Sequence, residues 1–318
     1  MKIPELDIYS FEITLGMLGR FETPKYMGSL LKGSFAWAFR NIVCVTKQPT
    51  CEGCMLKDTC AYFRIFETEI SAGHIPYLKG VRKVPHPFVL TPPLNGKTLY
   101  EPGEKLKIQL RLFGSAVQLL QYYVFVFQQI GKRGFGRADT LFEVLEFNAV
   151  IGNEVVPVIT PDGKTMTADL PTLRVPAATE ENFIGFQSVN LEFTTPVRIQ
   201  EAGKVLLKKD NVTPAVILNG LYRRYLALAG LYGNGGFLDQ KPDFPYEEIE
   251  VSSNSLAPFD WGRYSNRQKN YLDMSGLIGS ISLSGNILPA IPWLLAGSRI
   301  NMGKNTAYGL GQFRVVLS

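Results

Sequence analysis

The sequence Gly303-Lys-Asn-Thr-Ala-Tyr-Gly-Leu-Gly-Gln-Phe313 leads directly into an apolar segment with strand character, Phe313–Leu317. Gly303, Gly309 and Gly311 can adopt positive φ, and because they lack a Cβ they let another backbone come close. Lys304 adds a positive charge, so backbone N–H groups and an ammonium group could face a phosphodiester here. A tight turn before a final strand explains the same glycines equally well, and this stretch alone leaves both interpretations open.

A related pattern occurs near the middle of the chain. Gly131-Lys-Arg-Gly-Phe-Gly-Arg137 precedes another apolar segment, 141–150, which we predict to be a strand. The order Gly-Lys, further glycines and then a strand therefore occurs once in each half. This recurrence indicates a duplicated architecture.

Hydrophobic periodicity predicts the same order of elements in both halves. In the first half we expect strands at 8–18, 88–91, 105–113 and 141–150, and helices at 28–43 and 115–130. In the second half we expect strands at 187–196, 246–252, 278–283 and 313–317, and helices at 214–231 and 288–297. The order β-α-β-β-α-β is that of the ferredoxin-like fold. We therefore predict an α+β protein with two tandem ferredoxin-like (RRM-like) domains, 1–150 and 185–318, joined by a linker and hairpin, 151–184.

The four cysteines of the chain are close together in the sequence, at Cys44, Cys51, Cys54 and Cys60. Thiolates at this spacing are typical of a tetrahedral metal site. Zinc is the first candidate, an iron–sulfur cluster is the second, and the absence of any metal is the third. A closed site with four thiolates leaves no position for a substrate, so we expect a structural metal and no catalytic one.

Composition limits the class of protein. A length of 318 residues suits two domains, and the formal charge of +5 permits an anionic partner without requiring one. No apolar run is long enough to span a membrane, and residues 1–7 lack the apolar core of a signal peptide. We therefore expect a cytoplasmic protein.

Several further stretches occur in an order that is typical of one family. They are 31–40 (Leu-Lys-Gly-Ser-Phe-Ala-Trp-Ala-Phe-Arg), the cysteine cluster, 87–93 (Pro-Phe-Val-Leu-Thr-Pro-Pro), 260–268 (Asp-Trp-Gly-Arg-Tyr-Ser-Asn-Arg-Gln), 274–279 (Met-Ser-Gly-Leu-Ile-Gly) and the glycine-rich stretch 303–313. With these the chain resembles the CRISPR-associated endoribonucleases of the RAMP superfamily that cut precursor CRISPR RNA. Within that family it is similar to the subgroup with a four-cysteine insertion.

The resemblance implies two ferredoxin-like domains side by side, with CRISPR repeat RNA bound along the cleft. It also implies metal-independent cleavage, in which the 2′-OH attacks the adjacent phosphate and leaves a 2′,3′-cyclic phosphate and a 5′-OH. The family often uses a histidine near its first helix as general base, but here the only histidines are His74 and His86. Other members use lysine and tyrosine instead.

Such a reaction needs a base, a proton donor and positive charge beside the phosphate. The catalytic candidates are Lys25, Tyr26, Lys32 and His86. The RNA-binding candidates are Arg133, Arg137, Arg263, Arg267, Gly303, Lys304, Asn305, Gly309 and Gly311. Solvated surface positions would explain the lysines and arginines as well. Two other functions remain open: a catalytically silent protein that holds CRISPR RNA, and a structural subunit of a CRISPR effector complex.

Overall fold

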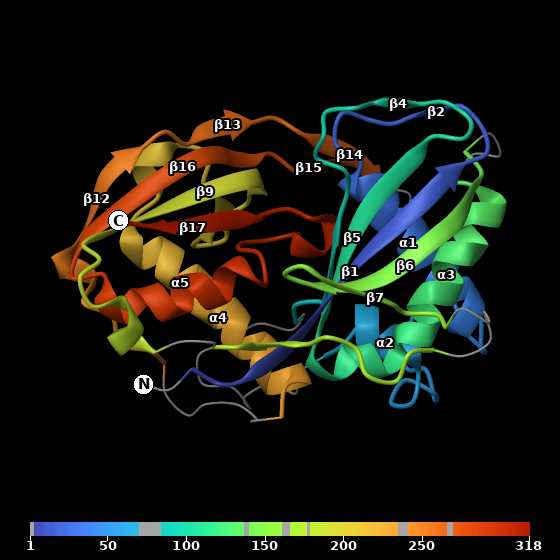
Figure 1. The fold of residues 1–318 in the computed structure, drawn as a ribbon, viewed down its shortest axis with the longest axis horizontal. Helices are drawn as coiled ribbons and strands as arrows, with labels where there is room; N and C mark the ends of the chain where they lie inside the picture. The colour runs from blue at the N-terminus through green and yellow to red at the C-terminus, as the bar shows by residue number, and fades with distance from the viewer. Residues whose placement is uncertain are drawn as a thin grey trace. The chain divides into compact units, whose positions relative to one another are not determined.

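The computed structural model describes residues 3–69, 84–136, 140–160, 166–176, 179–234, 241–265 and 270–318. These residues form two compact units, each with its own sheet and helices (Figure 1). The N-terminal unit comprises the described residues from Asp7 to Leu173. The C-terminal unit comprises those from Arg174 to Ser318 together with the first residues of the chain, up to Leu6.

The main sheet of the N-terminal unit has the order β3-β5-β1-β6-β7, and β2 pairs with β4 in a separate two-stranded sheet. Its elements are β1 (Leu6–Met17), β2 (Phe21–Glu22), α1 (Gly28–Val43), α2 (Ala61–Phe66), β3 (Phe88–Thr91), β4 (Leu99–Tyr100), β5 (Lys105–Phe113), the 3₁₀ helix η2 (Gly114–Leu119), α3 (Leu120–Arg133), β6 (Phe142–Ile151) and β7 (Glu154–Pro157). The first strand lies between the third and the fourth main strands. This is the strand order of a ferredoxin-like domain, extended at one edge by β7.

Helix α1 forms where the apolar spacing predicts it. Leu31, Phe35, Ala38 and Phe39 are buried and lie on one face of the helix. The Phe35 ring lies 5.3 to 5.8 Å, between ring centroids, from five other aromatic rings that belong to α1, α2, α3 and β3. This cluster fixes α1 and α2 on the sheet.

The C-terminal unit has a second antiparallel sheet, in the order β12-β16-β9-β17. After β8 (Leu173–Val175), at the boundary of the units, its elements are η3 (Glu180–Phe183), β9 (Ser188–Val197), β10 (Gln200–Glu201), β11 (Lys204–Val205), η4 (Lys209–Asn211), α4 (Pro214–Tyr232), η5 (Tyr246–Glu248), β12 (Ile249–Asn254), β13 (Ala257–Phe259), β14 (Gly262–Ser265), β15 (Asn270–Asp273), β16 (Gly276–Gly285), η6 (Leu288–Ala290), α5 (Ile291–Ser298), η7 (Thr306–Tyr308) and β17 (Phe313–Leu317). The main strands again follow the ferredoxin-like order, so the predicted tandem fold is confirmed.

The start of the chain is built into the C-terminal unit. The buried Tyr225 hydroxyl on α4 lies 2.8 Å from the Pro4 carbonyl oxygen and 3.0 Å from that of Val175, either of which can accept its hydrogen bond. Ile3 and Leu6 are buried as well. The segment 151–184, expected as a hairpin and linker, contains β7, β8 and η3.

The first predicted glycine loop is wrong over its first three residues. Helix α3 continues through Gly131, Lys132 and Arg133, and only Gly134 and Gly136 then adopt positive φ. A Cβ on Gly131 would lie 2.3 Å from the Phe142 carbonyl oxygen. Gly131 therefore lets the helix pass close to the start of β6.

One predicted strand starts later than expected. The strand expected at 246–252 starts at Ile249, after the 3₁₀ turn η5. Among the described residues, no helix combines the length and the apolar character that crossing a membrane requires.

Candidate functional site

Two of the four catalytic candidates meet at one aromatic ring in the N-terminal unit. The Lys32 Nζ atom on α1 lies 5.5 Å from the centroid of the Phe66 ring. The His86 imidazole approaches the same ring edge-on at 5.9 Å, and it stacks on Phe88 at 5.6 Å. Both Lys32 and His86 are half-buried. The structure thus places a cation and an imidazole against the same aromatic ring.

The other two catalytic candidates are placed differently. Lys25 is exposed, before the start of α1. Tyr26 is buried, with 8% of its surface exposed, and burial raises its pKa far above the usual value for tyrosine. Its phenol therefore stays protonated at any physiological pH, so it can take part in hydrogen bonds but cannot serve as a base.

The aromatic support of Lys32 continues along α2. Tyr62 stacks on Phe66 with 4.8 Å between ring centroids, and the Arg40 guanidinium lies 5.7 Å from the Tyr62 ring. Arg40 also donates hydrogen bonds to the carbonyl oxygens of Gln48 and Pro49. Sequence reasoning missed Phe66, Tyr62 and Arg40, because the pairing of α1 with α2 depends on the packing around Phe35.

A third cation–aromatic pair joins α1 to α3. The Arg133 guanidinium lies 5.6 Å from the centroid of the Trp37 ring, and 56% of Trp37 is exposed. Arg133 was predicted to bind RNA, whereas Trp37 was named only as part of the 31–40 stretch. The candidates Arg137 and Arg267, and also His74, lie outside the described residues.

The glycine-rich stretch of the C-terminal unit folds back on its own chain. Gly303, Gly309 and Gly311 have positive φ, and a Cβ on Gly311 would lie 1.8 Å from the Met302 carbonyl oxygen. The amides of Lys304, Tyr308, Gly309 and Gly311 donate to carbonyl groups within the unit. The glycines thus serve the turn, while the side chains of Lys304 and Asn305 are exposed.

Arg198 connects this loop to Ser275, which follows the hairpin formed by β14 and β15. Its carbonyl oxygen accepts a hydrogen bond from the Lys304 amide, and its buried guanidinium donates to the Ser275 carbonyl. Arg263 lies on β14 opposite Leu272. Arg198 escaped sequence reasoning because no motif surrounds it.

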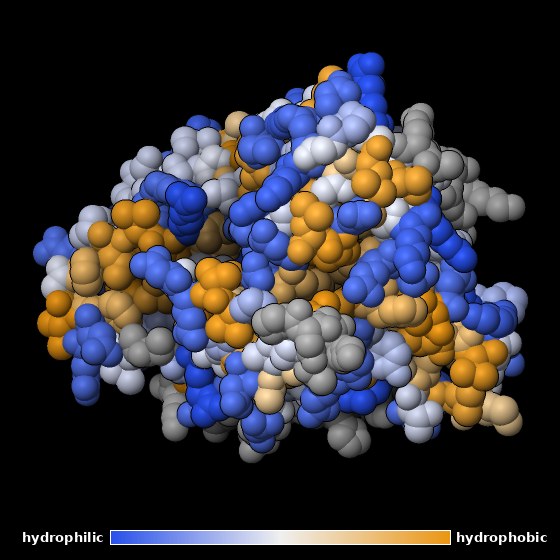
Figure 2. Space-filling view, turned by 45° about the vertical axis from the view of Figure 1, so that its right-hand side comes forward, coloured by the Kyte–Doolittle hydropathy of each residue, from blue (hydrophilic) through white to orange (hydrophobic). Residues whose placement is uncertain are grey.

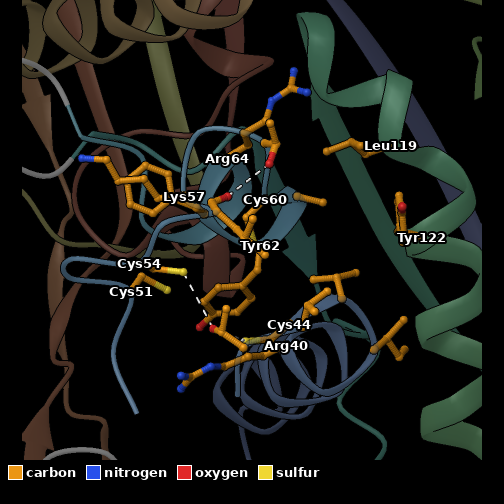
Figure 3. Close-up of a pocket in the computed structure, with 18 of the residues that line it drawn as sticks. Arg40, Cys44, Cys51, Cys54, Lys57, Cys60, Tyr62, Arg64, Leu119 and Tyr122 are labelled. Atoms are coloured by element: carbon orange, nitrogen blue, oxygen red, sulfur yellow. Dashed lines mark hydrogen bonds between the residues drawn. The ribbon is translucent and has the colours of Figure 1, made fainter. Parts of the chain in front are cut away.

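The four cysteines line one cavity of about 370 Å³, together with Arg40, Tyr62 and Tyr122 (Figure 3). Figure 3 shows Cys51 and Cys54 on one loop and Cys44 beside Arg40 at the end of α1. The Thr46 Oγ1 atom lies 3.7 Å from the Cys54 sulfur and 4.0 Å from the Cys44 sulfur.

The electrostatic surroundings of two of these thiols differ. Burial acts to raise the pKa of Cys44, but hydrogen bonds from the Lys47 backbone and from Thr46, with the charge of Arg40, outweigh it and lower that pKa. Burial and the charge of Glu67 raise the pKa of Cys51.

The fit of these cysteines to a metal is incomplete. Four thiols around one cavity are the donor set that zinc prefers. Within the part of the chain that the structure describes, however, no three His, Cys, Asp or Glu side chains converge in a way that would hold a metal ion.

Comparison with protein-family models gives two matches that follow the two units. The model AF_1859_N, an N-terminal domain, matches residues 6–170, which is just over half of the chain. The model "CRISPR-associated endoribonuclease Cas6" matches residues 191–313. The chain belongs to the AF_1859_N family, and its C-terminal part is similar to the Cas6 endoribonuclease model. The Cas6 model ends at Phe313, the last residue of the glycine-rich stretch.

One curated protein and several solved structures are similar to the chain at low sequence identity. An uncharacterized protein of Archaeoglobus fulgidus is 23% identical over 304 residues, which are 93% of both chains. A Cas6 of Thermus thermophilus in its product complex is 15% identical, with a TM-score of 0.52 over 97% of this chain and 100% of that one. A chain of a partial Cas6-RT-Cas1–Cas2 complex gives a TM-score of 0.59 at 13% identity. The match covers 98% of this chain but only 46% of that longer one.

Proposed function

We propose that this protein cuts CRISPR precursor RNA within its repeats, through attack of a 2′-OH on the adjacent phosphate and without a catalytic metal. The observation that carries the proposal is the meeting of Lys32 and His86 at the Phe66 ring. The Cas6 family match and the shared fold support RNA cleavage as the type of activity.

The two side chains suit the two halves of the reaction. A neutral His86 imidazole would take the proton of the 2′-OH as the new bond between the 2′-oxygen and phosphorus forms. The Lys32 ammonium would stabilise the negative charge on the phosphate oxygens and give a proton to the departing 5′-oxygen as its bond to phosphorus breaks. Each of these contributions is typically worth about 10²–10⁴ in rate.

The first test is cutting of the repeat RNA encoded beside the gene, with a chelator present and with a second RNA that carries one 2′-deoxy sugar at the cut site. We expect cutting of the first RNA only, with a cyclic phosphate at the new end. Lys32→Gln and His86→Gln should each slow a single turnover by about 10²–10⁴. Lys105→Gln, which removes an exposed cation from β5, is the matched control and should cut normally.

Two outcomes would overturn the proposal. Cutting of the deoxy substrate would exclude the 2′-OH as nucleophile, and normal rates in both variants would exclude Lys32 and His86. Tight binding without cutting would favour a catalytically silent CRISPR-RNA-binding protein. The lack of any histidine on α1 favours that second function.

We also propose that Cys44, Cys51, Cys54 and Cys60 hold a structural zinc ion, supported by their shared cavity. Elemental analysis of the purified protein should find one zinc per chain, and Cys54→Ser should lose it and lower the melting temperature. A visible absorption band from iron, or metal-free protein with unchanged stability, would contradict the zinc assignment.

A further inference from the structure

The three α-helices that the structure describes in the N-terminal unit carry only positive charges. Segments α1, α2, η2 and α3 contain no Asp or Glu. Their charged side chains are Lys32, Arg40, Arg64, Lys132 and Arg133. The nearest acidic group along the chain is Glu67, directly after α2. On the sheet, by contrast, Lys107 pairs with Glu12 at 2.7 Å. Charge of one sign on one set of helices suits a polyanion.

Three of these cations lie against aromatic rings, and α1 contributes one residue to every pair. The pairs are Lys32 with Phe66, Arg40 with Tyr62, and Arg133 with Trp37. From Lys32 to Arg40 the helix rises by about 12 Å. At the stacked spacing of about 3.4 Å per nucleotide, that distance matches three or four nucleotides.

Trp37 is the most accessible of these aromatic rings. Its exposed fraction of 56% is unusual for the largest apolar side chain, and Arg133 contributes the cation beside it. In Figure 2, which brings the side carrying α3 forward, apolar residues lie in separate patches among hydrophilic ones. An exposed aromatic ring beside a cation suits a nucleobase, whose ring stacks while its phosphate meets the guanidinium.

We propose that the outer face of these helices binds single-stranded RNA, with Trp37 stacking on a base and Arg133 holding a neighbouring phosphate. The site is additional to the Lys32–His86 pair, and it would guide the single-stranded part of a substrate beside that pair. The inference rests on the proposed function insofar as RNA is the ligand.

The test uses the intrinsic fluorescence of the full chain. In a Trp261→Phe background the remaining tryptophans are the exposed Trp37 and the buried Trp293. The probe is a 2′-O-methylated oligouridylate, which cannot be cut and contains no repeat sequence. We expect saturable quenching that weakens as salt rises, and no quenching when Trp37→Phe is added.

Fluorescence anisotropy of a labelled probe measures how much each variant changes the affinity for RNA. Trp37→Ala should weaken binding by about 5- to 150-fold, the range expected for loss of one stacked base, and Trp37→Phe should restore part of it. Arg133→Gln should lower the slope of log affinity against log salt by about 0.7. The controls, Lys105→Gln for charge and Phe186→Ala for an exposed aromatic, should leave both quantities unchanged.

The inference is wrong if Trp37→Ala and Arg133→Gln bind the oligouridylate like the parent protein. It is also wrong if polyglutamate quenches Trp37 while the oligouridylate does not, because the face would then serve an acidic protein. Repeat-RNA cutting in the same variants separates the two proposals. Binding that depends on Trp37 without any cutting removes only the proposed function, whereas cutting with unchanged affinity in the variants removes only this site.

Discussion

Replacement of Gly311 by alanine tests whether the glycine-rich stretch exists for its own fold. The added Cβ would lie 1.8 Å from the Met302 carbonyl oxygen, and the residue has a φ of +72°. Gly203→Ala is the matched control, since Gly203 has a φ of +82° with no atom within 4 Å of an added Cβ.

The magnitude follows from two separate costs. A left-handed conformation costs an alanine about 1–2 kcal/mol, and both variants share that cost. Only at Gly311 must the neighbouring backbone move as well, and overpacking of this kind costs about 1–3 kcal/mol. The movement also strains the hydrogen bonds from the Met302 amide to the Gly311 carbonyl and from the Gly311 amide to the Pro196 carbonyl, which are 2.8 and 2.9 Å long. We therefore expect Gly311→Ala to lose about 2–5 kcal/mol and Gly203→Ala about 1–2 kcal/mol.

Urea unfolding followed by circular dichroism, together with RNA affinity, measures both effects. Equal stability of the two variants would refute the role of close backbone contact. If Gly311→Ala were as stable as Gly203→Ala but had lost RNA binding alone, the glycine would serve the phosphate rather than the turn.

Three further predictions concern the C-terminal unit. Tyr225→Phe should lower the free energy of unfolding by about 1–3 kcal/mol, because it removes the one hydroxyl hydrogen bond that the Pro4 or the Val175 carbonyl accepts; a smaller change in a urea titration would contradict this. Gly297→Ala should cost about 1–3 kcal/mol, since its Cβ would lie 2.2 Å from the buried Leu221 side chain, and normal stability would show that Leu221 can move aside. Hydrogen bonds from the Ser275 side chain and backbone hold the pKa of Asp273 below its usual value, so its carboxylate stabilises the fold above about pH 4 and loses that effect as pH falls further. The melting temperatures of Asp273→Asn and the parent should therefore differ at pH 6 and approach each other as the pH falls below about 4; a constant difference would exclude this linkage.

Local patterns were sufficient for most elements. The helix Gly28–Val43 and the strand Lys105–Phe113 have the bounds that periodicity predicts, because each buries one regular stripe of apolar side chains. The ferredoxin-like strand order could be predicted from the order of strands and helices along the chain. The role of Gly131 could not be predicted, because the carbonyl group that it approaches belongs to Phe142, eleven residues further on, and only the folded chain brings them together.

The candidate site was only partly predictable for the same reason. Lys32 and His86 were singled out separately, but what joins them is Phe66, whose position depends on the ring cluster around Phe35. The sequence gives little reason to place Trp37 on the surface, because an apolar residue on an apolar helix is usually part of the core. Only the structure shows that it is exposed.

The packing of residues 3–6 against the C-terminal unit sets an order for folding during synthesis. Residues 3–6 leave the ribosome before the N-terminal unit, yet their partners begin at Arg174. The N-terminal unit can therefore complete its sheet while this short segment waits, and the C-terminal unit closes over it only when α4 has emerged. For the same reason a fragment cut at the boundary before Arg174 would lack the Pro4 carbonyl that lies beside the buried Tyr225 hydroxyl, so a separately expressed C-terminal half needs those first residues supplied as a peptide or fused to it.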